Sequence, residues 1–319
     1  MAADDNGRMS DIHLLEGVAA LNHLGVIRAR GDEAVPFLQG QLTNDVAGLG
    51  MSEARLAGYC SAKGRLLASF LVWKFAPDEL LLACSADVLD ATLKRLSMFV
   101  LRAKCRLSDA SAEVRLLGLA GAAARGWLGA AAPNEPWRIG ERGDGARVLR
   151  LPDAAGTPRY ILPVAGEAML PELPSLSLES WRWLEVQSGV ALIEAVNVEQ
   201  FVPQMVNLEL VGGVNFQKGC YPGQEVVARS HYRGTLKRRM ALFDSSALAH
   251  AGDDVFHDGD PAQPAGRVVN AAPSPHGGSS ALIEIKLAAL AGGGLHLQSP
   301  EGAVLERREL PYAFALEAA

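Results

Sequence analysis

The sequence predicts an α+β fold of two or three domains, built on antiparallel sheets and ending in a small C-terminal β-barrel. The first observation behind this prediction is length, because 319 residues exceed what one ordinary hydrophobic core accommodates. The second is the order of the predicted elements along the chain, because several strands follow one another before a helix, which is typical of α+β proteins. The third is the sequence beyond about residue 235, where turn segments at 258–261 and 273–278 separate short strands.

Composition describes an ordinary globular protein. Hydrophobic residues make up 49% of the chain and charged residues 21%, and the formal net charge of -6 argues against a protein built mainly to hold nucleic acid. No apolar run reaches the roughly 18 residues of a membrane helix, and the first residues lack the features of a signal peptide. The four cysteines include no Cys-x-x-Cys pair. We therefore expect a cytoplasmic protein with no membrane contact and no structural zinc.

The first 130 residues contain a series of short elements. Residues 1–10 are expected to be a flexible tail, and residues 11–21 carry the apolar spacing of a helix behind a Ser10 cap. A polar, glycine-containing segment at 39–45 is a candidate wall of a site, and 62–64 is the expected turn of a hairpin. The other predictions are strands at 24–29, 66–75, 80–84, 104–108 and 113–119 and helices at 32–38, 86–99 and 120–128.

These elements are expected to form interleaved domains. A linker at 171–179 leads into a helix at 179–188, with Gly189 as its stop. No nucleotide-binding glycine signature occurs. The expected units are a first α+β domain from 11–50 with 113–175, a second, ferredoxin-like α+β domain from 51–112 with 176–234, and a β-barrel from 235–319.

The glycine-rich segment 212–225 contains Cys220, the candidate functional thiol. Its glycines suit tight turns or close backbone approach to a ligand, and neither purpose requires a cysteine. Pro222 precedes an expected short helix, and Lys218 lies two residues before the thiol, so both a helix start and a cation favour the thiolate. The alternative, a small buried hydrophobe, is the interpretation that we assign to Cys60, Cys84 and Cys105.

Two further segments are candidates for ligand contact. The first is a run of positive charge that could receive an anionic ligand tail or an RNA backbone, with a solvated strand face as the alternative. In the second segment, a tryptophan indole can stack on a planar pterin, and a glutamine side chain can form a hydrogen bond with the edge of that ring. The alternative for each tryptophan is packing in the hydrophobic core. The residues are Arg229, His231, Arg233, Lys237, Arg238 and Arg239 in the first segment and Trp181, Trp183 and Gln187 in the second.

Four motifs together resemble the YgfZ family. They are Gln-Gly-Gln-Leu-Thr-Asn-Asp-Val at 39–46, Ala-Lys-Gly at 62–64, Pro-Gln-Met-Val-Asn-Leu at 203–208 and Lys-Gly-Cys-Tyr-Pro-Gly-Gln-Glu at 218–225. The resemblance implies a three-domain fold like that of the glycine-cleavage T-protein, with its domains around a central tetrahydrofolate cleft. It also implies a role in assembling or repairing iron-sulfur clusters, including those of enzymes that thiolate tRNA, and hence partners among iron-sulfur proteins or their assembly machinery.

The resemblance also suggests roles for individual residues. Cys220 would be the functional thiol and a possible transient cluster ligand, with Lys218 as its setting; no resident metal site is implied. The residues expected to approach tetrahydrofolate or a derivative are Leu24, Trp181, Gln187, Asn207 and Arg229.

The chain departs from the related aminomethyltransferases at the acidic residues that follow their Lys-Gly turn. Here Ala68 and Ser69 replace the acids, and Gln187 stands where those enzymes place a glutamate against the pterin. A neutral amide cannot act as a base, so we expect no aminomethyl transfer by that route. Two alternatives stay open: a one-carbon transferase that uses another acid, such as Glu185 or Glu225, and a folate-regulated module that binds RNA or protein.

Overall fold

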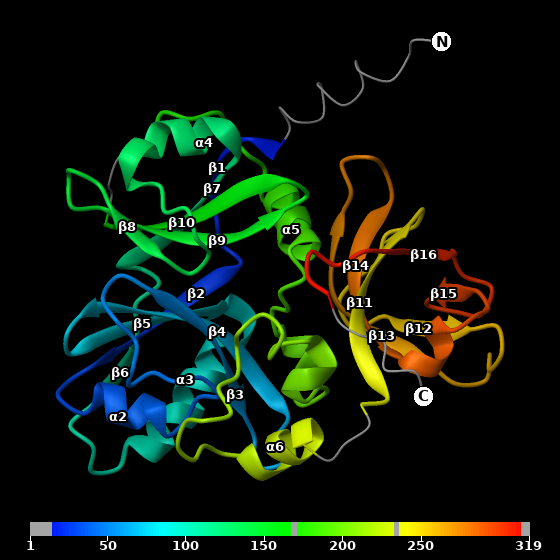
Figure 1. Ribbon diagram of the computed structural model, residues 1–319, viewed down its shortest axis with the longest axis horizontal. Helices are drawn as coiled ribbons and strands as arrows, with labels where there is room; N and C mark the ends of the chain where they lie inside the picture. The colour runs from blue at the N-terminus through cyan, green and yellow to red at the C-terminus, as the bar shows by residue number, and fades with distance from the viewer. Residues whose placement is uncertain (1–14, 167–170, 233–235, 314–319) are drawn as a thin grey trace.

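The computed structural model describes residues 15–166, 171–232 and 236–313, and it contains three antiparallel sheets in an α+β arrangement (Figure 1). The predicted fold class is confirmed. The first two sheets lie side by side, and the third forms a separate lobe next to helix α5. No helix in the described ranges is long and apolar enough to span a membrane.

The first sheet joins the N-terminal strand to the middle of the chain in the order β1-β7-β10-β9-β8. Helix α4 (Gly121–Leu128) packs on one face and buries Ala124 and Leu128 against the apolar residues of β7 and β10. The strands are β1 (Gly17–Ala20), β7 (Val114–Ala120), β8 (Ile139–Glu141), β9 (Arg147–Ala154) and β10 (Thr157–Ala165).

The second sheet has the order β3-β4-β5-β2-β6 and is covered by α3 (Ala86–Val100) and α2 (Ala34–Gln39). The hairpin of β3 and β4 turns at residues 61–65, as the Ala-Lys-Gly motif predicts. Its strands are β2 (Leu24–Arg30), β3 (Ala54–Cys60), β4 (Leu66–Ala76), β5 (Glu79–Ser85) and β6 (Arg106–Asp109).

The third sheet is the expected C-terminal barrel, with the order β15-β12-β13-β14-β11-β16. A bridge between His296 and Val304 brings the two edges together, so the sheet is nearly closed. Closure of this kind leaves few unpaired strand edges. Its strands are β11 (Arg238–Ser245), β12 (Asp254–His257), β13 (Gly266–Pro273), β14 (Ser279–Lys286), β15 (Leu295–Leu297) and β16 (Leu305–Arg308), with η5 (Leu287–Leu290) after β14.

Residues 171–232 lie between β10 of the first sheet and β11 of the barrel. Helix α5 (Leu178–Gln187) begins at Ser177, whose hydroxyl accepts a hydrogen bond from the Ser180 amide, and packs against β13 and β14. Helix α6 (Gln224–Tyr232) follows the segment that carries Cys220. Short 3₁₀ turns complete the connections: η2 (Gly129–Ala131), η3 (Ala195–Asn197) and η4 (Pro203–Val206).

Two sequence predictions near the N-terminus were wrong. Residues 17–20 form strand β1 and not a helix, because they pair with Leu117–Ala120 of β7 and Gly17 has a φ of 126° that no helix allows. Residues 1–14, with the rest of that expected helix and the tail, lie outside the described residues. In addition, β2 pairs with β5 and β6, so residues 24–30 belong to the second sheet and not with 113–175.

Candidate functional site

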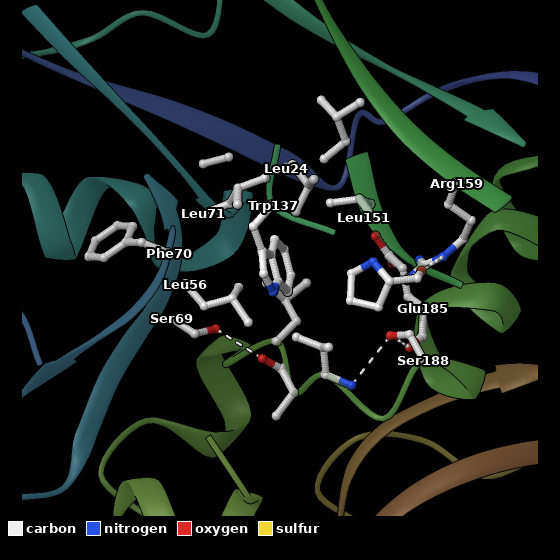
Figure 2. Close-up of a pocket in the computed structure, with 16 residues that line it drawn as sticks. Leu24, Leu56, Ser69, Phe70, Leu71, Trp137, Leu151, Arg159, Glu185 and Ser188 are labelled. Carbon is white, nitrogen blue, oxygen red and sulfur yellow. Dashed lines mark hydrogen bonds between the residues drawn. The ribbon is translucent and has the colours of Figure 1, made fainter. Parts of the chain in front are cut away.

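A cavity of about 90 Å³ lies where the first two sheets meet the C-terminal end of α5 (Figure 2). This volume exceeds the roughly 10–15 Å³ that one water molecule needs by the same measure. Its walls are mainly apolar, with a few polar groups among them, which is typical of small-molecule sites. The lining residues used below are Leu24, Leu56, Ser69, Trp137, Leu151, Arg159, Glu185 and Ser188.

Glu185 supplies the carboxylate of the cavity. One of its oxygens accepts a hydrogen bond of 2.8 Å from Nε1 of Trp181, and the other lies 3.0 Å from Nε2 of His23. Burial opposes the negative charge, but His23, Arg159 and the Trp181 indole outweigh it, so the pKa of Glu185 is lowered. The cavity therefore presents an ionised carboxylate, which accepts hydrogen bonds and is a weak base at neutral pH.

Arg159 is the cation of the same wall. Its guanidinium is almost fully buried and donates to the Pro152 carbonyl oxygen at 3.1 and 3.2 Å. Burial lowers the pKa of Arg159 to about 10, with Glu185 acting against this shift, so the group stays positive at neutral pH. It also lies 5.6 Å from the ring centre of Trp181.

The positions that replace the acids of the aminomethyltransferases face opposite sides of β4. Ser69 lines the cavity, whereas Ala68 packs into the core beneath α2 and α3. The Ser69 hydroxyl accepts from the Ile193 amide at 3.0 Å and donates to the Ala191 carbonyl oxygen at 3.3 Å. Its hydrogen bonds hold the loop after α5, and it offers no carboxylate to a ligand.

The residues expected to approach the folate do not all reach this cavity. Leu24 lines it, whereas Trp181 is not among the lining residues and contributes through its hydrogen bond to Glu185. Gln187, Asn207 and Arg229 are absent from the lining; Arg229 is exposed on α6. Trp183 points to the barrel instead, where its Nε1 donates to the Ser280 hydroxyl at 3.0 Å.

Asn207 has a structural position in the described fold. It adopts a left-handed backbone with φ of 56° at the end of η4, a conformation that asparagine tolerates better than most residues. Its fully buried amide donates to the Met240 carbonyl oxygen at 2.8 Å and so ties η4 to the barrel. The Pro-Gln-Met-Val-Asn-Leu motif therefore joins two parts of the molecule.

The four sequence motifs meet around the segment that carries Cys220. Lys218 donates through Nζ to the carbonyl oxygens of Gln39 and Leu42, in the segment that was the candidate site wall. Thr43 donates to the Gly213 carbonyl oxygen at 2.6 Å. On the other side, Gln204 donates to the Val227 carbonyl oxygen of α6 at 2.7 Å. Segments far apart in sequence thus hold the cysteine segment in place.

The Ala-Lys-Gly turn contacts the same segment through two glycines. A Cβ atom at Gly223 would lie 2.4 Å from the Ser61 carbonyl oxygen and 2.5 Å from Cα of Gly64. Both glycines have positive φ, 78° for Gly223 and 70° for Gly64. Gly64 and Gly223 are therefore required by backbone contact.

Cys220 is exposed, and it lies four residues before α6 begins. Helix α6 begins at Gln224, directly after the Pro-Gly pair, as predicted, so Cys220 lies near the start of this helix but not in its first turn. Burial lowers the pKa of Lys218 to about 8, against the charges of Asp45 and Cys220. Cys60 and Cys84 are buried, and burial raises the pKa of each to about 12, in agreement with their interpretation as small hydrophobes.

The basic run at 229–239 is partly neutralised. Arg238 forms an ion pair with Glu284, and Arg239 with Glu209, so neither is free to hold an anion. Arg233 lies outside the described residues. In the described part of the chain, no group of three or more His, Cys, Asp or Glu side chains could hold a metal ion.

The sequence carries only a weak signal for the residues that shape the cavity. Glu185 lies four residues after Trp181 and thus on the same face of a helix, a spacing that could have linked the two side chains. Arg159 stands out in the sequence, because it is a charged residue inside a strand of mainly apolar residues. His23 and Trp137 give no such signal, because they come from a turn and from a loop rich in proline, glycine and charge.

Comparison with known proteins agrees with this geometry. The chain is 34% identical over 244 residues to the tRNA-modifying protein YgfZ of Edwardsiella ictaluri, which covers 72% of each chain. It is 30% identical over 316 residues to the protein of that name from Sodalis glossinidius, covering 94% of each. Residues 14–139 match the GCVT N-terminal domain. The crystal structure of the glycine cleavage system aminomethyltransferase T from Bartonella henselae superposes with a TM-score of 0.73 at 18% identity, covering 94% of this chain and 87% of that one, which confirms the expected T-protein-like fold.

Proposed function

This chain belongs to the YgfZ family, and from that premise we propose that it is a tetrahydrofolate-binding protein that supports tRNA modification. In this proposal the cavity at Glu185 binds the folate. The Cys220 thiol serves the assembly or repair of iron-sulfur clusters in the enzymes that thiolate tRNA. The observation that carries the proposal is the ionised carboxylate of Glu185 in a mainly apolar cavity between two sheets.

The polar groups of the cavity can form hydrogen bonds with a reduced pterin. The edge of a pterin presents an amino group and a ring N–H side by side, and an ionised carboxylate can accept from both in charge-assisted hydrogen bonds. His23 and Trp181 orient the Glu185 carboxylate, and leucines on both sheets provide flat apolar walls. A bound folate would supply a reduced ring that can carry one-carbon units or electrons.

The same residues favour binding over aminomethyl transfer. A general base works best with a pKa near the operating pH, whereas the pKa of Glu185 is lowered. The Ser69 hydroxyl already forms hydrogen bonds with the backbone of Ala191 and Ile193. Glu225, the other acid considered as a substitute, is exposed on α6 and does not line the cavity.

The thiol is proposed to act outside the cavity. Gly223 touches the turn at Gly64, whereas the nearest cavity residue of β4 is Ser69, five residues further along the strand. At about 3.3 Å per residue, Gly64 and Ser69 are separated by up to about 17 Å. This separation supports thiol chemistry on a partner over direct attack on the folate.

Folate binding is tested by titrating the purified protein with 5-formyltetrahydrofolate in a calorimeter. We expect binding by the native chain and at least tenfold weaker binding by Glu185→Gln, which keeps the shape of the side chain but removes the charge. Glu225→Gln is the matched control and should bind as the native chain does. Equal binding by the native chain and Glu185→Gln would reject the assigned pocket.

The thiol role is tested in cells that lack the native protein. The thiolated nucleosides of their tRNA are quantified by mass spectrometry after expression of the native chain, Cys220→Ala or Cys105→Ala. We expect the first and third to restore thiolation and Cys220→Ala to fail. Full restoration by Cys220→Ala would eliminate the thiol from the function.

A further inference from the structure

Trp137 lies where three hollows of the molecule meet. Its side chain lines the inner cavity beside Leu56 and Leu151 (Figure 2). It also lines two outer grooves of about 410 and 460 Å³. The first groove carries the ion pair of Asp45 and Arg55, and the second carries Arg150. A ligand that fills the inner cavity and extends outward therefore passes this indole.

The backbone of Trp137 is strained and clamped. Its φ is 67°, which is a true outlier for a bulky side chain. Its N–H donates to the Arg150 carbonyl oxygen at 2.8 Å, and its carbonyl oxygen accepts from the Ala54 amide at 2.7 Å. One bond leads to β9 of the first sheet and the other to β3 of the second. Strain of this kind persists only where the surrounding structure enforces it, and it is concentrated at functional sites.

We infer that Trp137 is a ligand-positioning residue whose indole stacks on the planar pyrimidine ring of the pterin. The inference rests on the proposed folate-binding function. Two sheets fix the backbone from which the indole enters the cavity, so the stacking surface is present before the ligand arrives. Pre-organisation of this kind reduces the cost of ordering on binding. Aromatic stacking then adds to the hydrogen bonds at Glu185.

The simplest competing explanation is that Trp137 only packs against the core. Under that explanation, truncation lowers the melting temperature but leaves the affinity of the folded protein for a ligand unchanged. Under our inference, the affinity falls when the ring is removed and is largely retained when another aromatic ring replaces it. The two explanations therefore differ in ligand affinity, measured at a temperature where every variant is folded.

The test compares Trp137→Ala, Trp137→Phe and Trp127→Ala. Trp127 is a matched control because it is also partly buried, packs under the Arg142 guanidinium at 3.7 Å and does not line the cavity. The probes are 5-formyltetrahydrofolate and 6-hydroxymethylpterin, which lacks the tail. We expect Trp137→Ala to weaken both at least tenfold, Trp137→Phe to bind within about threefold of the native chain, and Trp127→Ala to leave affinity unchanged.

Three results would overturn the inference. The first is that the native chain binds the probe and Trp137→Ala binds it with the same affinity. This result would leave the proposed folate function intact. The second is a loss for 5-formyltetrahydrofolate alone, because it places the contact on the tail and not on the ring. The third is an absence of binding by the native chain, which removes the proposed folate function and the inference that rests on it.

Discussion

Glu185 and Cys220 are the two side chains on which the proposed chemistry rests, and their surroundings differ. Glu185 is held by an indole and an imidazole in a cavity, with a lowered pKa that keeps it ionised. Cys220 is exposed on a segment whose backbone is fixed by Lys218 and by a glycine contact. The first arrangement suits binding, and the second suits reaction with a large partner.

We predict that Cys220 is the most reactive thiol of the chain, because it is exposed whereas the other three cysteines are buried or partly buried. At pH 7.5 in native conditions, we expect one equivalent of thiol to react rapidly with a disulfide reagent and to map to Cys220 by mass spectrometry. Cys60 and Cys84 should react only on unfolding, because they are buried and burial raises the pKa of each to about 12. Cys105, partly buried with a raised pKa, should react more slowly.

The control for this measurement is Cys220→Ser, which should lose the rapid phase and retain the melting temperature of the native chain. A rapid phase that persists in Cys220→Ser would contradict the assignment. So would rapid labelling of Cys60 in the folded protein.

At the scale of elements, the contact between two turns fixes the position of the cysteine segment. The Ala-Lys-Gly turn of the β3–β4 hairpin and the Pro-Gly pair before α6 meet through glycine backbones. Neither glycine tolerates a side chain there, since both have positive φ. This requirement explains why glycine occurs in both motifs without any appeal to ligand contact.

We expect Gly223→Ala to destabilise the chain. The left-handed backbone alone costs about 1–2 kcal/mol for a residue with a Cβ, and the clash with Ser61 and Gly64 adds to this cost. Gly219→Ala is the matched control, because an added Cβ meets no atom within 4 Å and its φ is not left-handed. Urea unfolding gives the free energy of unfolding of both variants. Equal values for Gly223→Ala and Gly219→Ala would contradict the proposed contact.

The sequence predicted elements well where the signal was local. Helix α3, the hairpin turn and the barrel strands follow from apolar spacing and turn residues. Strand β1 was missed, because its short apolar run also fits a helix and its partner β7 lies about 100 residues away. The cavity was largely beyond prediction for the same reason: Trp137, Arg159 and Glu185 converge only through the pairing of distant strands.

At the scale of the whole molecule, one hydrophobic core links the three sheets. Its buried residues include Ile161 of the first sheet, Leu71 of the second and Leu282 of the barrel, with Leu184 of α5 between them. The charged groups of the cavity follow the same plan, because His23 precedes β2, Arg159 lies on β10 and Glu185 on α5. The site therefore depends on the assembly of the sheets and not on any one of them.

The ion pairs and hydrogen bonds around Glu185 predict how acid destabilises the protein. The pKa of Glu185 is lowered in the folded state, below the ordinary value of 4.5, because the favourable charges outweigh burial. A carboxylate of this kind contributes stability that is complete above its unfolded pKa and is lost as the pH falls through the folded pKa. Glu185→Gln lacks this contribution at every pH. The difference in unfolding free energy between the native chain and Glu185→Gln should therefore be largest at pH 6–7 and shrink below about pH 4.5. Urea unfolding at several pH values measures it, and a difference that stays constant down to pH 3.5 would show that Glu185 does not hold the sheets through its charge.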